Sequence, residues 1–155
     1  NGCEMDGLFG YNPQSYDEML RSGQRIYAVA TDDNHNGYPF GHPMCDSFGG
    51  YVMVKMPSLN YANTMEALKA GRFYFSTGPE ICEAKIVDNV LTVKTSKVQK
   101  IYVVMDGRNC YKKVAEDDAG ITEAAFELSG KDKWIHIIIE DEKRQHAGTN
   151  AYFMD

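Results

Sequence analysis

The chain runs Ile26-Tyr27-Ala28-Val29-Ala30 and continues directly as Thr31-Asp32-Asp33-Asn34-His35. The first five residues are apolar without polar alternation, which is typical of a strand buried on both faces of a parallel sheet. The polar residues that follow stand where the carboxyl end of such a strand would lie, and α/β proteins build their active sites there. The stretch therefore predicts a buried parallel strand that carries a functional site at its end.

The residues around this stretch extend the α/β pattern over positions 1–79. On the amino-terminal side, Ser15 and Glu18 have the spacing of a helix capping box, and Gly23 is placed to end that helix. On the carboxyl side we expect a strand, a helix and a second strand, over Tyr51–Met56, Asn60–Gly71 and Phe73–Phe75. Strands and helices that alternate in this way indicate an α/β fold.

Residues 80–155 change to a β pattern. The runs with strand character are Val90–Lys94, Lys100–Met105, Ile121–Leu128, Trp134–Glu140 and Asn150–Met154. Apolar and polar residues alternate in the third and fourth runs, which places one face of each in a core and the other toward water or a partner. We expect the last two runs to pair as a hairpin across a charged loop. This region is predicted to form a small antiparallel β-sandwich.

The first part holds too few elements to close a parallel sheet that is covered on both faces. The chain also begins at Asn1 rather than at a methionine. We therefore expect it to be the C-terminal portion of a larger protein. Its fold class is predicted as α/β followed by all-β.

Composition excludes several classes of protein. The formal net charge is −6, which argues against a general nucleic-acid binder because phosphates attract a basic surface. No run approaches the roughly 18 apolar residues that a membrane-spanning helix needs. The four cysteines form no C-x-x-C pair, and their irregular spacing favours a reduced, cytoplasmic protein over a disulfide scaffold.

Asp33 and His35 are the first candidates for chemistry. Two residues apart at the end of a strand, they can point the same way and offer one oxygen and one nitrogen ligand, which suits zinc, manganese or iron. The alternative is a solvated polar turn, because D-x-H is a short pattern that occurs often by chance.

Three further residues are candidates for the same site. His42 and Cys45 form an H-x-x-C pattern that, with His35, has the composition of a zinc site. Unconnected loop residues are the alternative for both. Arg72 has the guanidinium group that suits phosphate; alternatively it pairs with a carboxylate such as Glu66. We therefore treat His42, Cys45 and Arg72 as possible substrate or second-metal contacts.

The run from Tyr16 to Ile81 resembles the end of the PHP (polymerase and histidinol phosphatase) superfamily, in the group of bacterial metallohydrolases with an added C-terminal β domain. Four segments carry the resemblance in order: Tyr16–Gly23, Ala28–His35, Asp46–Val54 and Ala67–Pro79. In the second half, Trp134–Ile137 and Ala151–Phe153 look like the closing strands of that β domain.

The resemblance implies a distorted (β/α)7 barrel, of which residues 1–79 would be the C-terminal part, followed by the β-sandwich. It also implies up to three metal ions (zinc, manganese or iron), with Asp33 and His35 as the family's last metal-binding motif. Such metals activate a water molecule for attack on the phosphorus of a small phosphorylated substrate. The chain departs from the family in having no His-x-His motif, so we expect it to be inactive alone.

Two hypotheses follow from the sequence. In the first, the chain is the C-terminal part of a PHP-type phosphoesterase and supplies Asp33 and His35 to its site. In the second, it is a non-enzymatic β-sandwich module for binding or oligomerisation, whose exposed face carries Trp134, His136 and Tyr152. If the chain folds by itself, the missing barrel neighbours leave unpaired strand edges and apolar faces, which predict a homo-oligomer.

Overall fold

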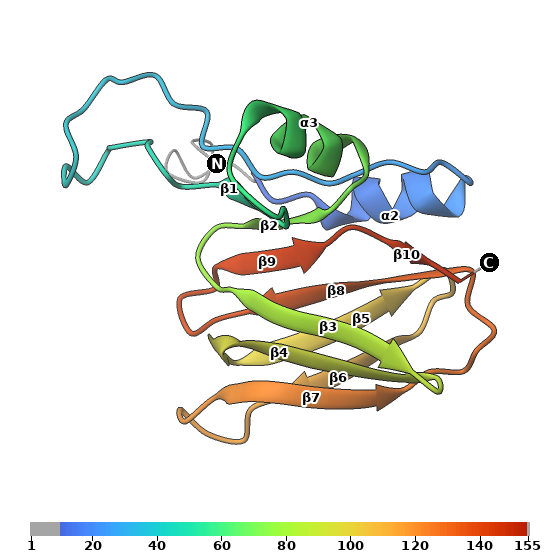
Figure 1. Cartoon of the computed structure of the whole chain (residues 1–155). Helices are drawn as coiled ribbons and strands as arrows, with labels where there is room; N and C mark the ends of the chain where they lie inside the picture. Colours follow the sequence, from blue (N-terminus) through green and yellow to red (C-terminus); the bar gives the residue numbers. More distant parts are fainter. Residues whose placement is uncertain (1–9, 155) are drawn as a thin grey trace. The chain divides into compact units, whose positions relative to one another are not determined.

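The computed structural model describes residues 10–154, and its chain divides into two compact units, one up to Thr77 and one from Gly78 onward. The elements of the first unit are α2 (Pro13–Arg21), β1 (Tyr51–Val54), α3 (Tyr61–Lys69) and β2 (Phe73–Ser76) (Figure 1). β1 and β2 pair in antiparallel orientation, with Tyr51 opposite Ser76 and Val54 opposite Phe73.

Helix α2 begins one turn earlier than the sequence predicts. The side chain of Asn12 caps it by accepting a hydrogen bond from the Ser15 backbone N–H at 3.2 Å, and Pro13 follows at the first helical turn, where its missing N–H costs nothing. The predicted capping box is therefore wrong, because Ser15 lies inside the helix. Gly23 ends the helix as expected, with φ at +89°.

Helix α3 has the predicted termini. Asn60 accepts a hydrogen bond from the Asn63 backbone N–H at 2.9 Å through its side-chain oxygen. Gly71 follows the helix with φ at +67°, a conformation that glycine adopts without strain. A Cβ atom at this position would also lie 2.4 Å from the ring of Tyr27. The contact with Tyr27 is therefore a second reason, besides the positive φ, for glycine at position 71.

The predicted barrel portion is wrong. The described part of the chain is mostly β with antiparallel sheets, and the segment Ile26–Ala30 forms no strand. A parallel sheet needs neighbouring parallel strands to hydrogen-bond its central strand. In the first unit β1 and β2 pair with each other in antiparallel orientation. They therefore give the apolar run no parallel strand to pair with. Its residues alternate between half-buried and exposed positions.

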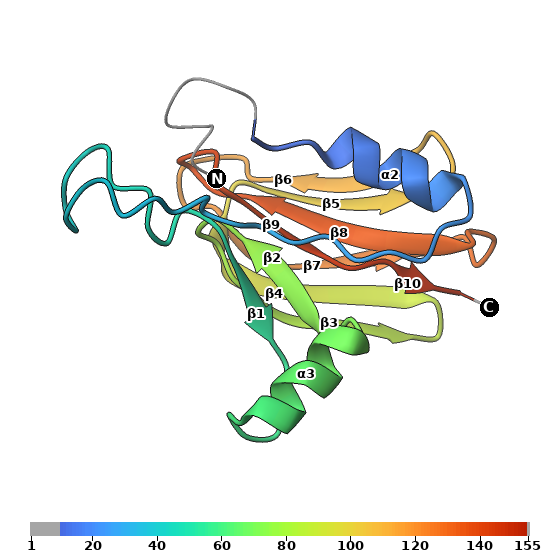
Figure 2. The same ribbon diagram turned by 90° about the horizontal axis from the view of Figure 1, so that it is seen from above.

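The second unit consists of two antiparallel sheets. Its strands are β3 (Ile81–Val87), β4 (Val90–Val98), β5 (Lys100–Met105), β6 (Cys110–Val114), β7 (Ile121–Glu127), β8 (Trp134–Glu140), β9 (His146–Thr149) and β10 (Tyr152–Phe153). One sheet has the order β9-β8-β5-β6, with β10 also paired to β8, and the other has the order β3-β4-β7. Figure 2 shows the two sheets as separate layers.

Alternating residues of β4 and β5 contribute to the core of this unit. Leu91 and Val93 of β4 are fully buried, as are Ile101 and Val103 of β5. In the central pairing of the larger sheet, Val103 lies opposite Ile137 of β8. Cross-strand contacts between β-branched side chains stabilise such sheets.

Two hairpins of the second unit follow from local sequence. Asp88 and Asn89 join β3 to β4 with φ at +49° and +62°, as expected for a two-residue turn with both positions left-handed. β10 pairs with β8 as predicted, with Tyr152 opposite Ile135 and Phe153 opposite Trp134, but the segment expected to be a loop forms β9, which also pairs with β8, with Ala147 opposite Ile139.

Candidate metal-binding arm

Residues 31–50 of the first unit form a long segment without helix or strand, which we call the arm (Figure 1). The arm is closed at its base. Gly50 is buried, and a Cβ atom there would lie 2.6 Å from the carbonyl oxygen of Thr31. Real Cβ atoms do not approach backbone so closely, so the absence of a side chain at Gly50 lets the two ends of the arm meet.

Side chains of the arm link its first residues to its last. Asp32 Oδ2 accepts a hydrogen bond from the Phe48 backbone N–H at 2.8 Å. The amide nitrogen of Asn34 donates to the hydroxyl of Ser47. These bonds hold residues 32–35 beside residues 46–48 in the absence of a backbone ladder.

The third link joins Asp46 to His35. Asp46 Oδ2 accepts the His35 backbone N–H at 2.6 Å and lies 3.4 Å from Nδ1 of the same histidine. The backbone N–H of His35 is the main cause that holds the pKa of the Asp46 carboxyl below its ordinary value. The carboxylate therefore stays ionised and fixes the imidazole from one side.

Asp46 and His35 differ in exposure. The Asp46 side chain is only 14% exposed, whereas that of His35 is 73% exposed. The second carboxylate oxygen, Oδ1, is buried and has no hydrogen-bond partner among residues 10–154. Sequence reasoning missed Asp46 as a site residue because eleven positions separate it from His35 and no spacing rule connects them.

Asp33 lies next to this pair on exposed backbone. Its φ is +54°, in the left-handed region, which aspartate tolerates better than most residues. Asn36 has a similar φ of +53°, and its N–H donates to the side-chain oxygen of Asn34 at 2.7 Å. The structure gathers no group of three or more metal-ligating side chains within residues 10–154.

His42 and Cys45 lie in one turn at the far part of the arm. Nδ1 of His42 accepts the Met44 backbone N–H at 3.1 Å, and its carbonyl oxygen accepts the Cys45 N–H at 2.9 Å. The ring of His42 stacks on that of Tyr38, with centroids 4.4 Å apart. The H-x-x-C pattern thus forms a compact turn, and the described residues do not bring it together with His35 as a three-ligand group.

Arg72 pairs with a carboxylate, as in the alternative considered from the sequence. Its guanidinium forms an ion pair with Glu66 at 2.7 Å between Nη2 and Oε1. The pair connects the residue before β2 with helix α3 of the same unit. Because this carboxylate neutralises the guanidinium, nothing here favours phosphate at Arg72.

The predicted binding face of the β domain is also corrected. Trp134 and His136 are 3% and 1% exposed, and their rings stack with centroids 5.8 Å apart. Tyr152 is 39% exposed. Two of the three residues are therefore packing residues, since a strand with both faces buried offers no surface to a ligand.

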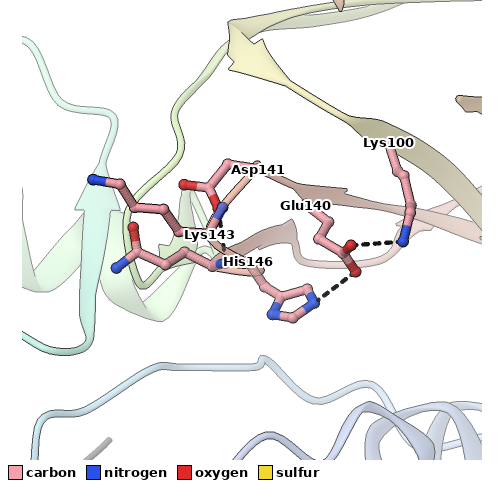
Figure 3. Close-up of polar contacts among 6 residues, drawn as sticks. Lys100, Glu140, Asp141, Lys143 and His146 are labelled. Carbon is pink, nitrogen blue, oxygen red and sulfur yellow. Dashed lines mark hydrogen bonds and ion pairs between the residues drawn. The ribbon is translucent and has the colours of Figure 1, made fainter. Parts of the chain in front are cut away.

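A second polar cluster lies in the second unit (Figure 3). Glu140 Oε1 accepts from Lys100 Nζ at 2.6 Å, and Glu140 Oε2 lies 3.3 Å from His146 Nε2. Burial raises the pKa of Glu140, but the hydrogen bond and charge of Lys100 outweigh it and leave that pKa below its ordinary value. The same hydrogen bond raises the pKa of Lys100. The adjoining turn is held by Asp141, whose Oδ1 accepts the N–H groups of Lys143 and Gln145.

Comparisons with known proteins give no relative. No family model, no curated protein and no solved structure matches this chain. Among the residues that the structure describes, no helix has the length and apolar character to cross a membrane.

Proposed function

We propose that this chain supplies the metal-binding segment of a PHP-like, metal-dependent phosphoesterase, with His35 and Asp33 as ligands. One observation carries the proposal: Asp46 lies against Nδ1 of His35, while the His35 side chain is 73% exposed. Metal-ligating histidines almost always give their second ring nitrogen to a carboxylate, carbonyl or water. In His35 a carboxylate oxygen lies 3.4 Å from the corresponding nitrogen, Nδ1.

The position of Asp46 decides which nitrogen of His35 is free to bind. A carboxylate 3.4 Å from Nδ1 favours the proton on that nitrogen, so the lone pair of the neutral ring lies on Nε2. His35 is thereby prepared as an Nε2 ligand for a divalent metal.

The neighbouring donors fit a metal of the zinc, manganese or iron class. Asp33 adds an exposed carboxylate two residues from His35, and imidazole with carboxylate suits these ions. Asp46 lies at Nδ1 of His35, so it orients the histidine and does not itself add a donor on the Nε2 side. Two ligands are fewer than the three that a catalytic zinc takes from protein, so we expect the rest from outside this chain.

When bound, the metal would lower the pKa of a coordinated water and polarise a phosphoryl oxygen. The residues of the arm would bind and orient the metal. Its substrate would be a small phosphorylated molecule. With an incomplete ligand set, the 155-residue chain alone should bind metal weakly and hydrolyse little or no phosphoester.

Calorimetric titration of zinc and manganese into the chain tests the proposal. We expect weak binding that disappears in the double variant Asp33→Ala/His35→Ala. The variant His42→Ala is the matched control, because it removes an exposed imidazole from the same arm and should leave binding unchanged. Binding that survives in the double variant, or that is absent from the unaltered chain, contradicts the proposal.

A second experiment tests the reaction. With the remaining metal ligands supplied, His35→Ala should reduce metal-dependent hydrolysis of p-nitrophenyl phosphate by at least about tenfold, the lower range for altered metal sites. Unchanged hydrolysis in His35→Ala would contradict the proposal.

The cellular setting and assembly belong to the same proposal. Cys45, Cys82 and Cys110 are free thiols, which supports a cytoplasmic protein because disulfides are rare there. The net charge of −6 gives nucleic acid little attraction. Large exposed apolar side chains in the first unit, such as Phe40, Phe48 and Leu59, support self-association into a homo-oligomer.

A further inference from the structure

Strand β1 has one edge without a partner strand. Among the described residues 10–77, β1 pairs with β2 alone, and Figure 2 shows β1 on the outer side of this pair. An unpaired edge presents a row of backbone N–H and C=O groups to which another strand can bind. The edge of β1 is therefore a candidate interaction surface.

The register of β1 against β2 identifies the backbone groups at this edge. The N–H of Lys55 donates to the carbonyl oxygen of Arg72, the residue opposite, at 2.8 Å. Hydrogen-bonded and non-hydrogen-bonded pairs alternate along an antiparallel ladder, so Met53 also directs its backbone groups toward β2. Val52 and Val54 direct their N–H and C=O groups outward, where no backbone bond satisfies them within the part of the chain that the structure describes.

β1 lacks the charges that protect other edges. Its sequence is Tyr51-Val52-Met53-Val54, and Met53 is 41% exposed. The longer edge strands of the second unit all carry charged side chains, namely Glu83 and Lys85 in β3, Lys112 and Lys113 in β6, and Glu123 and Glu127 in β7. Charged side chains at an edge oppose pairing with another chain. The uncharged, apolar edge of β1 therefore favours such pairing.

The charges beyond the two ends of β1 have opposite signs. Lys55 follows the strand directly and is exposed. Before the strand lies the arm, which has no lysine or arginine and in which Asp32 accepts the backbone N–H of Phe48. When identical strands pair in antiparallel orientation, the amino end of each lies beside the carboxyl end of the other. Lys55 of one copy then meets the acidic arm of the second copy, so the charges are complementary.

Exposed apolar side chains extend this surface at both ends of the strand. Phe48 precedes β1 and Leu59 follows it, and these residues are 73% and 89% exposed. Antiparallel pairing brings Phe48 of one copy toward Leu59 of the other. This added area matters because a stable interface buries about 1,200 Å² or more, which a strand of four residues does not supply alone.

We propose that β1 pairs in antiparallel orientation with β1 of a second copy of this chain, about a two-fold axis that passes beside Met53. In this register Val52 of each copy exchanges backbone hydrogen bonds with Val54 of the other, and the two Met53 residues form a non-hydrogen-bonded pair. The inference rests on the self-association proposed above and adds its surface and its geometry. It does not depend on the metal site.

Crosslinking tests the register. With the four native cysteines replaced by serine, Met53→Cys should form a disulfide-linked dimer under mild oxidation. The reason is that the Cα atoms of a non-hydrogen-bonded pair lie about 4.5 Å apart, within the range that a disulfide spans. Met19→Cys is the matched control, since Met19 of α2 is 44% exposed. Equal crosslinking of the two variants, or none in Met53→Cys, overturns the proposal.

Sedimentation velocity measures the affinity. Met53→Lys places like charges directly opposite each other across the axis and should raise the dimer Kd by about fivefold or more. Met19→Lys adds the same charge at an exposed residue of α2 and should leave the Kd within about twofold. Equal Kd values for the two variants would overturn the β1 interface and leave the self-association standing. A monomeric unaltered chain would overturn both.

Discussion

At the scale of single residues, Asp46 is the side chain on which the arrangement of His35 depends. It accepts the backbone N–H of His35 at 2.6 Å and also lies against the ring. Asp32 offers a natural comparison, because it is also an aspartate of the arm that accepts a backbone N–H, that of Phe48. Of these two aspartates, Asp46 is the one that contacts His35, the proposed metal ligand.

Asp46→Ala should therefore weaken zinc binding by about tenfold or more, the usual cost of losing the carboxylate behind a metal-bound histidine. Asp32→Ala should change the zinc Kd by less than about threefold, because its partner is a backbone group away from the ring. Calorimetric titration of both variants measures the difference. Equal losses in the two variants would mean that Asp46 acts only by ordering the arm.

Gly50 gives a second prediction at this scale. Gly50→Ala would place Cβ 2.6 Å from the Thr31 carbonyl oxygen, so the base of the arm must open. We expect the free energy of unfolding of the first unit to fall by about 1–3 kcal/mol, as for other overpacked buried sites. Urea unfolding measures the change, with Gly37→Ala as the control, because a Cβ at Gly37 meets nothing within 4 Å. An unchanged midpoint for Gly50→Ala would show that the arm is open in solution.

At the scale of elements, local signals predicted more than long-range ones. Asn60 and Gly71 bound α3 as expected, and β4, β5, β7 and β8 lie on the predicted runs. These elements have local causes, namely a capping side chain, a left-handed glycine or period-two alternation. The capping-box pattern predicted that α2 starts at Ser15, whereas the structure caps the helix at Asn12. Asn12 was not recognised because it is followed by proline and has no acidic residue three positions later.

Three strands of the second unit were not predicted from the sequence. β6 (Cys110–Val114) has no buried residue, and most of β3 (Ile81–Val87) is exposed or half-buried. β9 (His146–Thr149) falls in the segment expected to be a charged loop, and its residues His146, Ala147, Gly148 and Thr149 have no strand periodicity. Pairing with a neighbouring strand creates these elements, and one sequence read alone does not show that pairing.

The pairing of β5 with β8 yields a pH-dependent prediction. Lys100 lies opposite Glu140 in the register, and the folded-state pKa of Glu140 is below its ordinary value of 4.5. A lowered carboxyl pKa stabilises the fold above the unfolded-state pKa, and this stability is lost as the pH falls through the folded-state value. Acid should therefore remove the contribution of the Lys100–Glu140 pair.

Lys100→Met should lower the free energy of unfolding by about 1 kcal/mol at pH 7, a modest value because the pair is partly exposed. The difference from the unaltered chain should shrink as the pH approaches about 3. Lys94→Met is the control: its 3.4 Å contact with Glu83 joins side chains that are 49% and 47% exposed, so its loss should cost less. A pH-independent difference for Lys100→Met would contradict the account of this pair.

At the scale of the whole molecule, exposed apolar side chains are concentrated in the first unit. Among the described residues 10–77 these are Met19, Tyr27, Val29, Tyr38, Phe40, Met44, Phe48, Met53, Leu59 and Tyr61, whereas the described part of the second unit contributes Val87, Val90, Val114 and Tyr152. A surface of this kind favours association. The prediction of a barrel failed at this scale, since a run of strand-like residues does not specify which strands will pair with it.

Sedimentation velocity tests the association directly. The unaltered chain should form a dimer or larger species at micromolar concentration, and Phe40→Ser/Phe48→Ser should shift it toward the monomer, because both rings are more than 70% exposed. Val87→Ser/Val90→Ser changes exposed residues of the second unit and is the matched control. A monomeric unaltered chain would contradict the predicted homo-oligomer.

The most direct test of the central claim, that His35 is a metal ligand, is paramagnetic broadening by Mn²⁺ of the imidazole signals of the four histidines. Broadening falls steeply with distance, so a bound ion reports the histidine that holds it. The account predicts that the signals of His35 disappear first, at substoichiometric Mn²⁺, and that Asp33→Ala weakens this effect. Equal broadening of His35 and His42, or none at His35, would contradict the metal-binding role of the arm.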